Sequence, residues 1–220
     1  MAGTSPGLRV SDSLGLPERA RGIRQLRETL AAIDRVHCVG PLPWIQVEIR
    51  SQMPQAGRFL YNPLGGVPLG IALRRGNSSK RLTLAHEVGH FLDYSAIGQP
   101  NRFETTARAI VLAGWRQAVM ASTSVQRLLR LRGARPSSPR IGGHIHTGCV
   151  RYPATDVELW ARSYAQYVAL RGRDAALLDE LDAARARGAG VDFAEQWDDD
   201  DFAPIAHAID ELFERLGWRR

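Results

Sequence analysis

The segment His86-Glu87-Val88-Gly89-His90 constrains this chain more than any other feature. Apolar residues recur around it at helical spacing and predict a helix over residues 80–94, at Leu82, Ala85, Val88 and Leu92. Positions four apart on an α-helix differ by ~400° of rotation and ~6 Å of rise, so both imidazoles leave the same face. Gly89 between them allows a neighbouring element or a substrate to approach the helix closely.

Two imidazoles on one helix face can hold a tetrahedral Zn²⁺ through nitrogen atoms at ~2.0–2.1 Å. Glu87 lies ~100° around the helix from His86, where it can reach a water on the metal without being a ligand. The motif therefore predicts metal-assisted hydrolysis, in which Zn²⁺ activates the water and Glu87 moves its proton to the leaving amine. The alternative is a helix whose two histidines face solvent or pair with carboxylates.

A catalytic zinc needs a third protein ligand and an open fourth position. The metzincin continuation HExxHxxGxxH is excluded, because Asp93 stands where that pattern has glycine and Ala96 where it has histidine. The best candidate is Glu158, near the start of a helix predicted over residues 156–171. Asp93 and Glu104 are fallback ligands, and Asp93 can instead hydrogen-bond a metal-binding histidine.

Glu158 also has a purely structural interpretation. Thr155-Asp156-Val157-Glu158 matches a capping box, in which the glutamate reaches back to the backbone N–H of the threonine. The residues alone leave both roles open. Arg162, one turn later on nearly the same face, either orients Glu158 from behind or forms an ordinary i,i+4 pair with it.

The two segments together resemble a known family. His86-Glu87-Val88-Gly89-His90, followed by Glu158-Leu-Trp-Ala-Arg162-Ser-Tyr-Ala-Gln-Tyr167, looks like the gluzincin-type zinc metallopeptidase domains of phage and mobile-element polyvalent proteins. The resemblance covers residues 68–170. It implies a zincin-like fold, with a small mixed β-sheet over the active-site helix, and it implies that Glu158 is the third zinc ligand.

Further residues compete for supporting roles. Tyr152, Tyr164 and His146 are the candidates to stabilise the oxyanion of the reaction. His144, His146 and Cys149 form a loose H-x-H-x-x-C pattern, for which solvated loop histidines are the simpler interpretation. The acidic run over residues 198–201 lacks the spacing of a calcium loop and is interpreted as a turn before the last helix.

The pattern along the chain predicts an α+β fold in one domain over residues 18–220, with a mostly helical C-terminal half, a flexible segment at 1–17 and an irregular loop at 133–150. Strand 68–74 precedes the motif and is predicted to be an edge strand that pairs with an extended peptide. Strands are predicted at 44–50, 57–61 and 68–74, and helices at 18–36, 80–94, 102–132, 156–171, 174–187 and 202–216.

Charge gives a second functional hypothesis. The net charge is +6, and Lys80 is the only lysine. A basic surface steers nucleic acid or acidic partners, although a solvated face is the simpler interpretation of the arginine cluster Arg127, Arg130, Arg132, Arg135 and Arg140. The first alternative to a peptidase is therefore a non-catalytic zincin scaffold that binds nucleic acid or protein, and the second is a zinc hydrolase of non-peptide amides.

The chain shows no pattern of a signal peptide, and no stretch approaches the ~20 apolar residues that span a bilayer. Cys38 and Cys149 are far apart in the sequence, which argues against a disulfide scaffold. We therefore expect no membrane partner and a cytoplasmic location. A protein delivered by a phage or mobile element would have the same sequence features.

Overall fold

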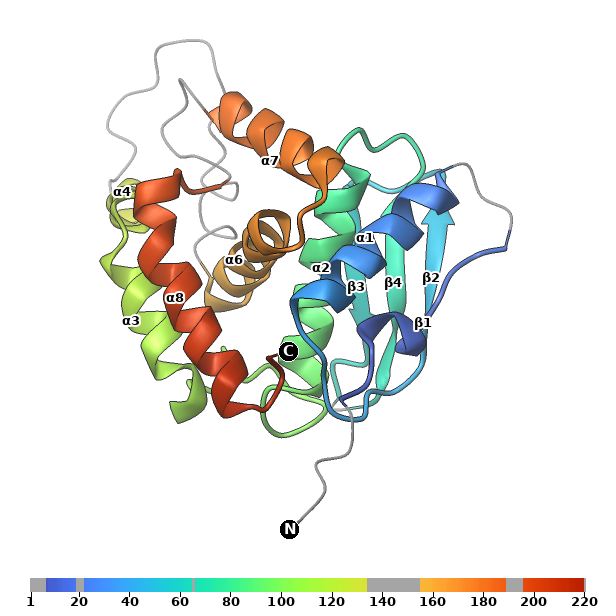
Figure 1. Cartoon of the computed structure of the whole chain (residues 1–220), viewed down its shortest axis with the longest axis horizontal. Coiled ribbons are helices and arrows are strands. Elements are labelled where there is room, and N and C mark those ends of the chain that lie inside the picture. Colours follow the sequence, from blue (N-terminus) through green and yellow to red (C-terminus); the bar gives the residue numbers. More distant parts are fainter. Residues whose placement is uncertain (1–6, 19–21, 65, 134–154, 189–195, 220) are drawn as a thin grey trace.

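The computed structural model describes residues 7–18, 22–64, 66–133, 155–188 and 196–219 (Figure 1). It confirms an α+β fold with a small mixed sheet and a mostly helical second half. The first half contains η1 (Val10–Ser13), β1 (Leu14–Gly15), α1 (Ile23–Val36), β2 (Ile45–Arg50), β3 (Gly57–Tyr61), β4 (Pro68–Arg74) and α2 (Lys80–Ser95). The second half contains η2 (Ile110–Leu112), α3 (Ala113–Ala121), α4 (Thr123–Gly133), α6 (Asp156–Arg171), α7 (Ala175–Gly188) and α8 (Asp199–Arg215).

The four strands lie in the order β1-β2-β4-β3. β2 pairs in parallel with both β1 and β4, whereas β3 pairs antiparallel with β4. The prediction that strand 68–74 is an edge strand is wrong: β4 has a hydrogen-bonded neighbour on each side, and its residues Ile71, Ala72 and Leu73 are buried. The edge strand beside the motif helix is β3.

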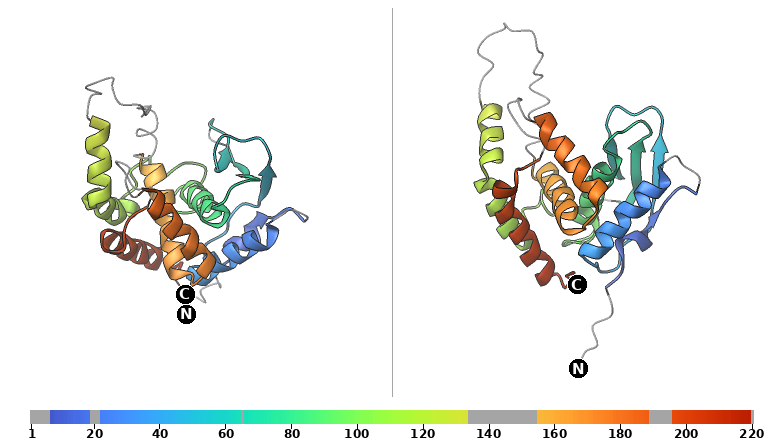
Figure 2. Two further views of the ribbon diagram at one scale, coloured as in Figure 1. Left: turned by 90° about the horizontal axis from the view of Figure 1, so that it is seen from above. Right: turned by 45° about the horizontal axis from the view of Figure 1, so that its top comes forward.

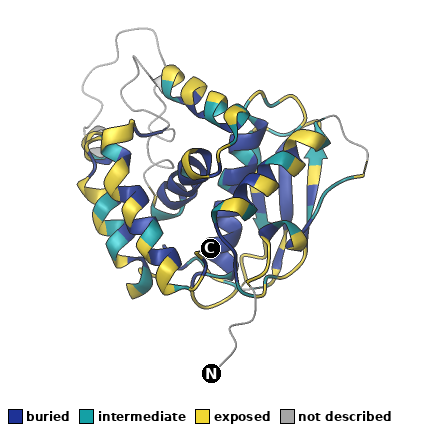
Figure 3. Cartoon of the chain, in the orientation of Figure 1, coloured by how far each residue is buried: buried dark blue, intermediate teal, exposed yellow. Residues whose placement is uncertain are grey.

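Helix α2 lies at the centre of the molecule, between the sheet and α6 (Figures 1 and 2). α1 covers the same face of the sheet as α2, and α3, α4 and α8 lie on the far side of α6. The predicted apolar stripe of α2 is buried, but so are most of its polar residues (Figure 3). Polar side chains that are removed from water in this way need hydrogen-bond or ionic partners inside the protein.

The helix predicted over residues 102–132 is instead divided into η2, α3 and α4. The break falls at Ser122, whose ψ angle of 142° is extended. The carboxylate of Asp201 accepts hydrogen bonds from the backbone N–H groups of Thr123 (2.7 Å) and Ser124 (2.9 Å). A carboxylate from α8 therefore caps the N-terminus of α4, which a local pattern cannot reveal.

The acidic run is part of α8 rather than a turn before it. Asp198 is the N-cap and accepts the N–H of Asp201, so the helix begins three residues earlier than predicted. Acidic side chains in a first turn also interact favourably with the positive end of the helix dipole.

The described part of the N-terminal segment differs from the flexible tail that was expected. Leu8 forms a bridge with Val39, β1 adds a strand to the sheet beside β2, and Val10 is fully buried. The ordered pieces are only two to four residues long, too short for a periodic pattern to appear in the sequence. α1 begins at Ile23, five residues after the predicted start.

No helix among the described residues is long and apolar enough to cross a membrane.

Candidate metal centre

The two helices that carry the candidate ligands touch at Gly89. A Cβ atom at this position would lie 3.0 Å from the Cα of Ala161 and 3.1 Å from Cδ1 of Tyr164, so only glycine allows this approach without movement. Trp160 Nε1 donates a 2.9 Å hydrogen bond to the Gly89 carbonyl. The close contact and this bond hold the first turns of α6, which include Glu158, against the face of α2 that carries the histidines.

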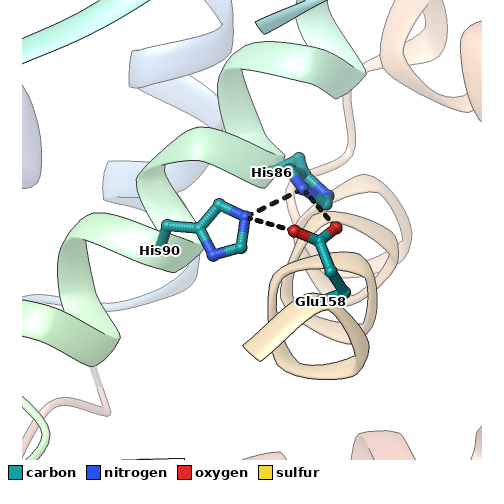
Figure 4. A group of neighbouring side chains, drawn as sticks. All are labelled: His86, His90 and Glu158. Carbon is teal, nitrogen blue, oxygen red and sulfur yellow. Dashed lines mark hydrogen bonds and ion pairs between the residues drawn. The ribbon is translucent and has the colours of Figure 1, made fainter. Parts of the chain in front are cut away.

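His86, His90 and Glu158 form one compact group (Figure 4). The Nε2 atoms of the two histidines lie 3.1 Å apart. Glu158 Oε2 lies 3.4 Å from His86 Nε2, and Oε1 lies 3.4 Å from His90 Nε2. Three or more His, Cys, Asp or Glu residues with ligand atoms within 4.8 Å of one another could hold a metal ion. Within the part of the chain that the structure describes, this is the one such group.

The donor set fits a metal ion. Two imidazole nitrogens and a carboxylate oxygen are the ligands of many catalytic zinc sites. His90 and Glu158 are buried, and His86 is the most exposed member of the group, with 21% of its side chain exposed. Two imidazole nitrogens and a carboxylate that converge in a largely buried place could hold a cation between them.

Different atoms of Glu158 take part in the helix cap and in the group with the histidines. Thr155 is the N-cap of α6, and its Oγ1 accepts the backbone N–H of Glu158 at 3.4 Å. The carboxylate of Glu158 meanwhile faces both histidines. Burial acts to raise the pKa of Glu158, but hydrogen bonds from His86 and His90 outweigh it and hold that pKa well below its usual value. The carboxylate is therefore ionised and available to a cation.

Glu87 lies on the neighbouring side of α2, against the edge strand. A Cβ atom at Gly57 would lie 2.5 Å from Glu87 Oε1, and the carboxylate accepts a backbone hydrogen bond from Phe59. Glu87 is only 4% exposed. Burial raises the pKa of Glu87, and the nearby His86 and His90 only partly oppose this. A carboxyl group whose pKa is shifted toward neutrality suits both uptake and release of a proton.

Neither fallback ligand reaches the histidines. The carboxylate of Glu104 accepts hydrogen bonds from Arg102 Nε (2.6 Å) and Gln99 N (2.9 Å). Asp93 is fully buried and accepts hydrogen bonds from the N–H (3.0 Å) and Oγ1 (2.5 Å) of Thr105. His90 Nδ1 is buried without a hydrogen-bond partner among the described residues, so Asp93 does not hold it in the predicted way.

The buried carboxyl of Asp93 makes a prediction about stability. Burial raises the pKa of Asp93 to about 6, against the hydrogen bonds from Thr105. A carboxyl whose pKa is raised on folding stabilises the protein below its unfolded pKa, and that contribution is lost as the pH rises through about 6. Asp93→Asn keeps an acceptor for the Thr105 N–H without a charge. From pH 5 to pH 7.5, its free energy of unfolding should rise relative to wild type by about 1 kcal/mol.

Urea unfolding of both proteins in excess chelator at the two pH values measures this difference. A difference between the two proteins that does not change with pH would contradict the assignment.

The residues predicted to support the reaction lie in different places relative to the site. The Tyr164 hydroxyl is fully buried and lies 2.8 Å from His37 Nε2, so it is not available to an oxyanion, and that prediction is wrong. Burial also raises the pKa of Tyr164 well above its usual value. Arg162 lines the cavity at the site. Tyr152, His146, His144 and Cys149 lie outside the described residues.

Aromatic side chains beside His90 were not predicted as part of the site. The ring of Phe103 stands edge-on to His90 at 6.3 Å between centroids and also contacts Tyr61 and Tyr94 at 5.1 Å each. Phe103 lies in a turn that was predicted to be helical, so its contact with α2 depends on the fold of residues 101–109. This aromatic group forms one wall next to the metal site.

A cavity of about 1040 Å³ opens over the group. Its walls include residues from β3, from the end of β4 and the turn after it, from the motif, from the first turns of α6 and from the end of α7. The volume is at the upper end of the range for ligand pockets. It is large enough for several residues of an extended chain. In the arginine cluster of the sequence, Arg127 and Arg130 are exposed on α4, and the side chains of the other three lie outside the described residues.

Comparison of the chain with protein-family models, with curated proteins and with solved structures gave no match.

Proposed function

We propose that this chain is a zinc-dependent peptidase of the gluzincin type, in which His86, His90 and Glu158 hold Zn²⁺ and Glu87 is the general base. The observation that carries the proposal is the convergence of both histidine Nε2 atoms on the Glu158 carboxylate, with the buried Glu87 directly after His86 in the same helix. A scaffold that only needed a metal would not need Glu87 there.

The chain's own residues divide the chemistry between them. When bound, Zn²⁺ would supply a Lewis acid that lowers the pKa of a water and polarises a substrate carbonyl. Glu87 accepts the proton of the attacking water and later donates it to the nitrogen of the leaving amine. Its raised pKa makes the carboxylate a stronger base for taking the proton from the water, and the Phe59 N–H orients the carboxylate. The wall formed by Phe103 limits the access of bulk water from the side of His90.

The edge strand supports a peptide as the substrate. In the sheet formed by the described residues, β3 pairs with β4 on one side only, and residues of β3 line the cavity. An extended peptide can add to such an edge through backbone hydrogen bonds, which places its own amides beside Glu87. A mixed sheet with its antiparallel edge strand next to the motif helix also supports a zincin-like fold as part of the proposal.

Removal and return of the metal test the proposal directly. We expect the purified chain to contain stoichiometric zinc by mass spectrometry and to cleave a mixed fluorogenic peptide library. Dipicolinic acid should abolish the cleavage, and added Zn²⁺ should restore it, because the ligands themselves are not altered by the chelator. Cleavage that survives complete removal of the metal would reject the proposal. Zinc binding without cleavage would favour the non-catalytic scaffold.

Gly57 offers a test of the position of Glu87. A Cβ at residue 57 would lie 2.5 Å from both Glu87 Oε1 and Thr83 Cγ2, so Gly57→Ala should push the Glu87 carboxylate and the Thr83 methyl group away from β3. Both clashes are with side chains rather than with backbone, so we expect displacement of the carboxylate rather than unfolding, which circular dichroism verifies. We expect kcat to fall by about 10–100-fold, since a displacement of about 1 Å in a reacting group costs on that order.

Zinc content should stay unchanged in this variant. Gly76→Ala is the matched control, because a Cβ there meets nothing within 4 Å. Equal kcat in the two variants would contradict the placement of Glu87 as the base.

A further inference from the structure

Outside the candidate catalytic group, the charged residues on the described walls of the cavity are of one sign. Its described lining contains four arginines, one each from β3, β4, α6 and α7: Arg58, Arg74, Arg162 and Arg187. The carboxylates of this lining are Glu87 and Glu158, which belong to the catalytic group. Apart from that group, the charged side chains of the described walls are therefore all positive.

Arg58 and Arg74 lie on neighbouring strands. Arg58 pairs with Ala72 in the register of β3 and β4, and Arg74 is two residues further along β4. Residues two apart on a strand share a face, so the two arginine side chains leave the same face of the sheet as diagonal neighbours. Two like charges at that spacing repel each other unless an anion lies between them.

Within the described part of the chain, neither arginine forms an ion pair. Arg74 Nη1 donates to the carbonyl of Pro54 at 3.3 Å, which is a neutral acceptor, and Arg58 is exposed on the edge strand. Arg50, the neighbour of Arg74 on β2, instead pairs with Glu48. The charges of Arg58 and Arg74 thus remain available to a ligand in the cavity.

These arginines line the same cavity as the reacting groups Glu87 and Glu158. Gly57 faces Glu87, so the side chain of Arg58, the next residue on the strand, leaves the opposite face of β3 at the rim of that cavity. A peptide that adds to the β3 edge would place alternate side chains on the same face as Arg58. Oppositely charged side chains that face each other across strands attract, and walls of a single charge sign also concentrate the opposite charge in solution.

We propose that the cavity selects acidic polypeptide segments, with Asp or Glu within a few residues of the cleaved bond, and that Arg58 and Arg74 determine this specificity. The inference rests on the proposed peptidase function for the cleavage step, but not for binding. A peptide is favoured over a nucleic acid because the arginines flank a strand edge whose backbone groups pair with another backbone.

Binding is measured first, in the Glu87→Gln protein loaded with zinc, so that cleavage does not interfere. Two fluorescein-labelled peptides of equal length are used, one rich in Glu and one with Gln at the same positions. By fluorescence anisotropy, we expect the acidic peptide to bind at least about tenfold more tightly at low salt, and the advantage to shrink as the salt concentration rises. Arg58→Gln with Arg74→Gln should remove this advantage and leave the neutral peptide within about twofold.

The control is Arg24→Gln, an 88% exposed arginine on α1 that does not line the cavity. Charge reversal, Arg58→Glu with Arg74→Glu, should turn the preference toward a Lys-rich peptide. Zinc content and circular dichroism verify that each variant is folded.

Equal binding of the Glu and Gln peptides, no binding of either, or an equal loss for both in the double variant would overturn the proposal. Tighter binding of a single-stranded DNA of matched charge would overturn it in favour of a nucleic acid.

Cleavage by the unmodified chain separates this inference from the proposed function. A preference for acidic peptides in binding, without any cleavage that depends on Glu87, would reject the peptidase and keep the acidic ligand. Cleavage of both peptides with equal kcat/KM would keep the peptidase and reject the acidic specificity.

Discussion

Glu87→Gln is expected to lower kcat/KM for peptide hydrolysis by about 10²–10⁴-fold, the usual contribution of a positioned general base. Glutamine has nearly the same shape and can still accept the backbone hydrogen bond from Phe59, but it cannot take a proton from water. The zinc content should not change, because the proposed ligand atoms belong to His86, His90 and Glu158. Activity and zinc, measured on the same preparation, give the two results.

The free energy of unfolding supplies a third measurement. Glu87 is buried, and burial raises the pKa of Glu87, so a neutral amide at this position should not destabilise the protein. Glu48→Gln on the exposed side of β2 is the matched control and should leave activity and zinc unchanged. Full activity in Glu87→Gln would mean that another group moves the proton, and the proposed mechanism would then be wrong.

The local parts of the fold were predictable from the sequence. The predicted bounds of β3, β4 and α6 agree with the structure, and those of α2 differ by one residue at its end. These elements have a clear apolar period and are bounded by turn residues or by a capping threonine. The two histidines and Glu87 also follow from helical spacing alone, because their relation is set within two turns of one helix.

The features that were missed depend on contacts between distant parts of the chain. The position of β3 at the edge of the sheet is a matter of strand order, which no single strand encodes. The break between α3 and α4 is fixed by Asp201, and the distance of Tyr164 from the cavity follows from its hydrogen bond to His37. The contact of Gly57 with Glu87 and the wall formed by Phe103 arise in the same way.

Glu158 lies between these two cases. Its residue type and its place at the start of α6 allowed a ligand and a cap equally, and the resemblance to a family favoured the ligand. The structure places the carboxylate beside both histidines because Gly89 lets α6 pack closely on α2. That contact joins residues about seventy positions apart, so the sequence pattern alone could not decide it.

Loss of a residue that only orients a metal ligand typically weakens metal binding by about 10–100-fold. Glu158→Ala should weaken zinc binding by more than this. In the proposed site the carboxylate is one of three protein ligands, and two histidines on one helix would leave the ion with half of a tetrahedral shell. Glu158→Gln should behave similarly, since it keeps the length of the side chain but removes its charge. Competition with a zinc-binding dye measures the dissociation constant of each variant.

Thr155→Ala separates the ligand from the cap. It removes the oxygen that accepts the Glu158 N–H and should cost about 1 kcal/mol of stability, the usual value for a lost N-cap, while zinc affinity stays near that of wild type. Zinc should also raise the unfolding temperature of wild type and of Thr155→Ala but not of Glu158→Ala, because a ligand stabilises only the state that binds it. If Glu158→Ala kept its zinc and lost only stability, as Thr155→Ala is expected to do, Glu158 would be a helix cap and the third ligand would have to come from another residue.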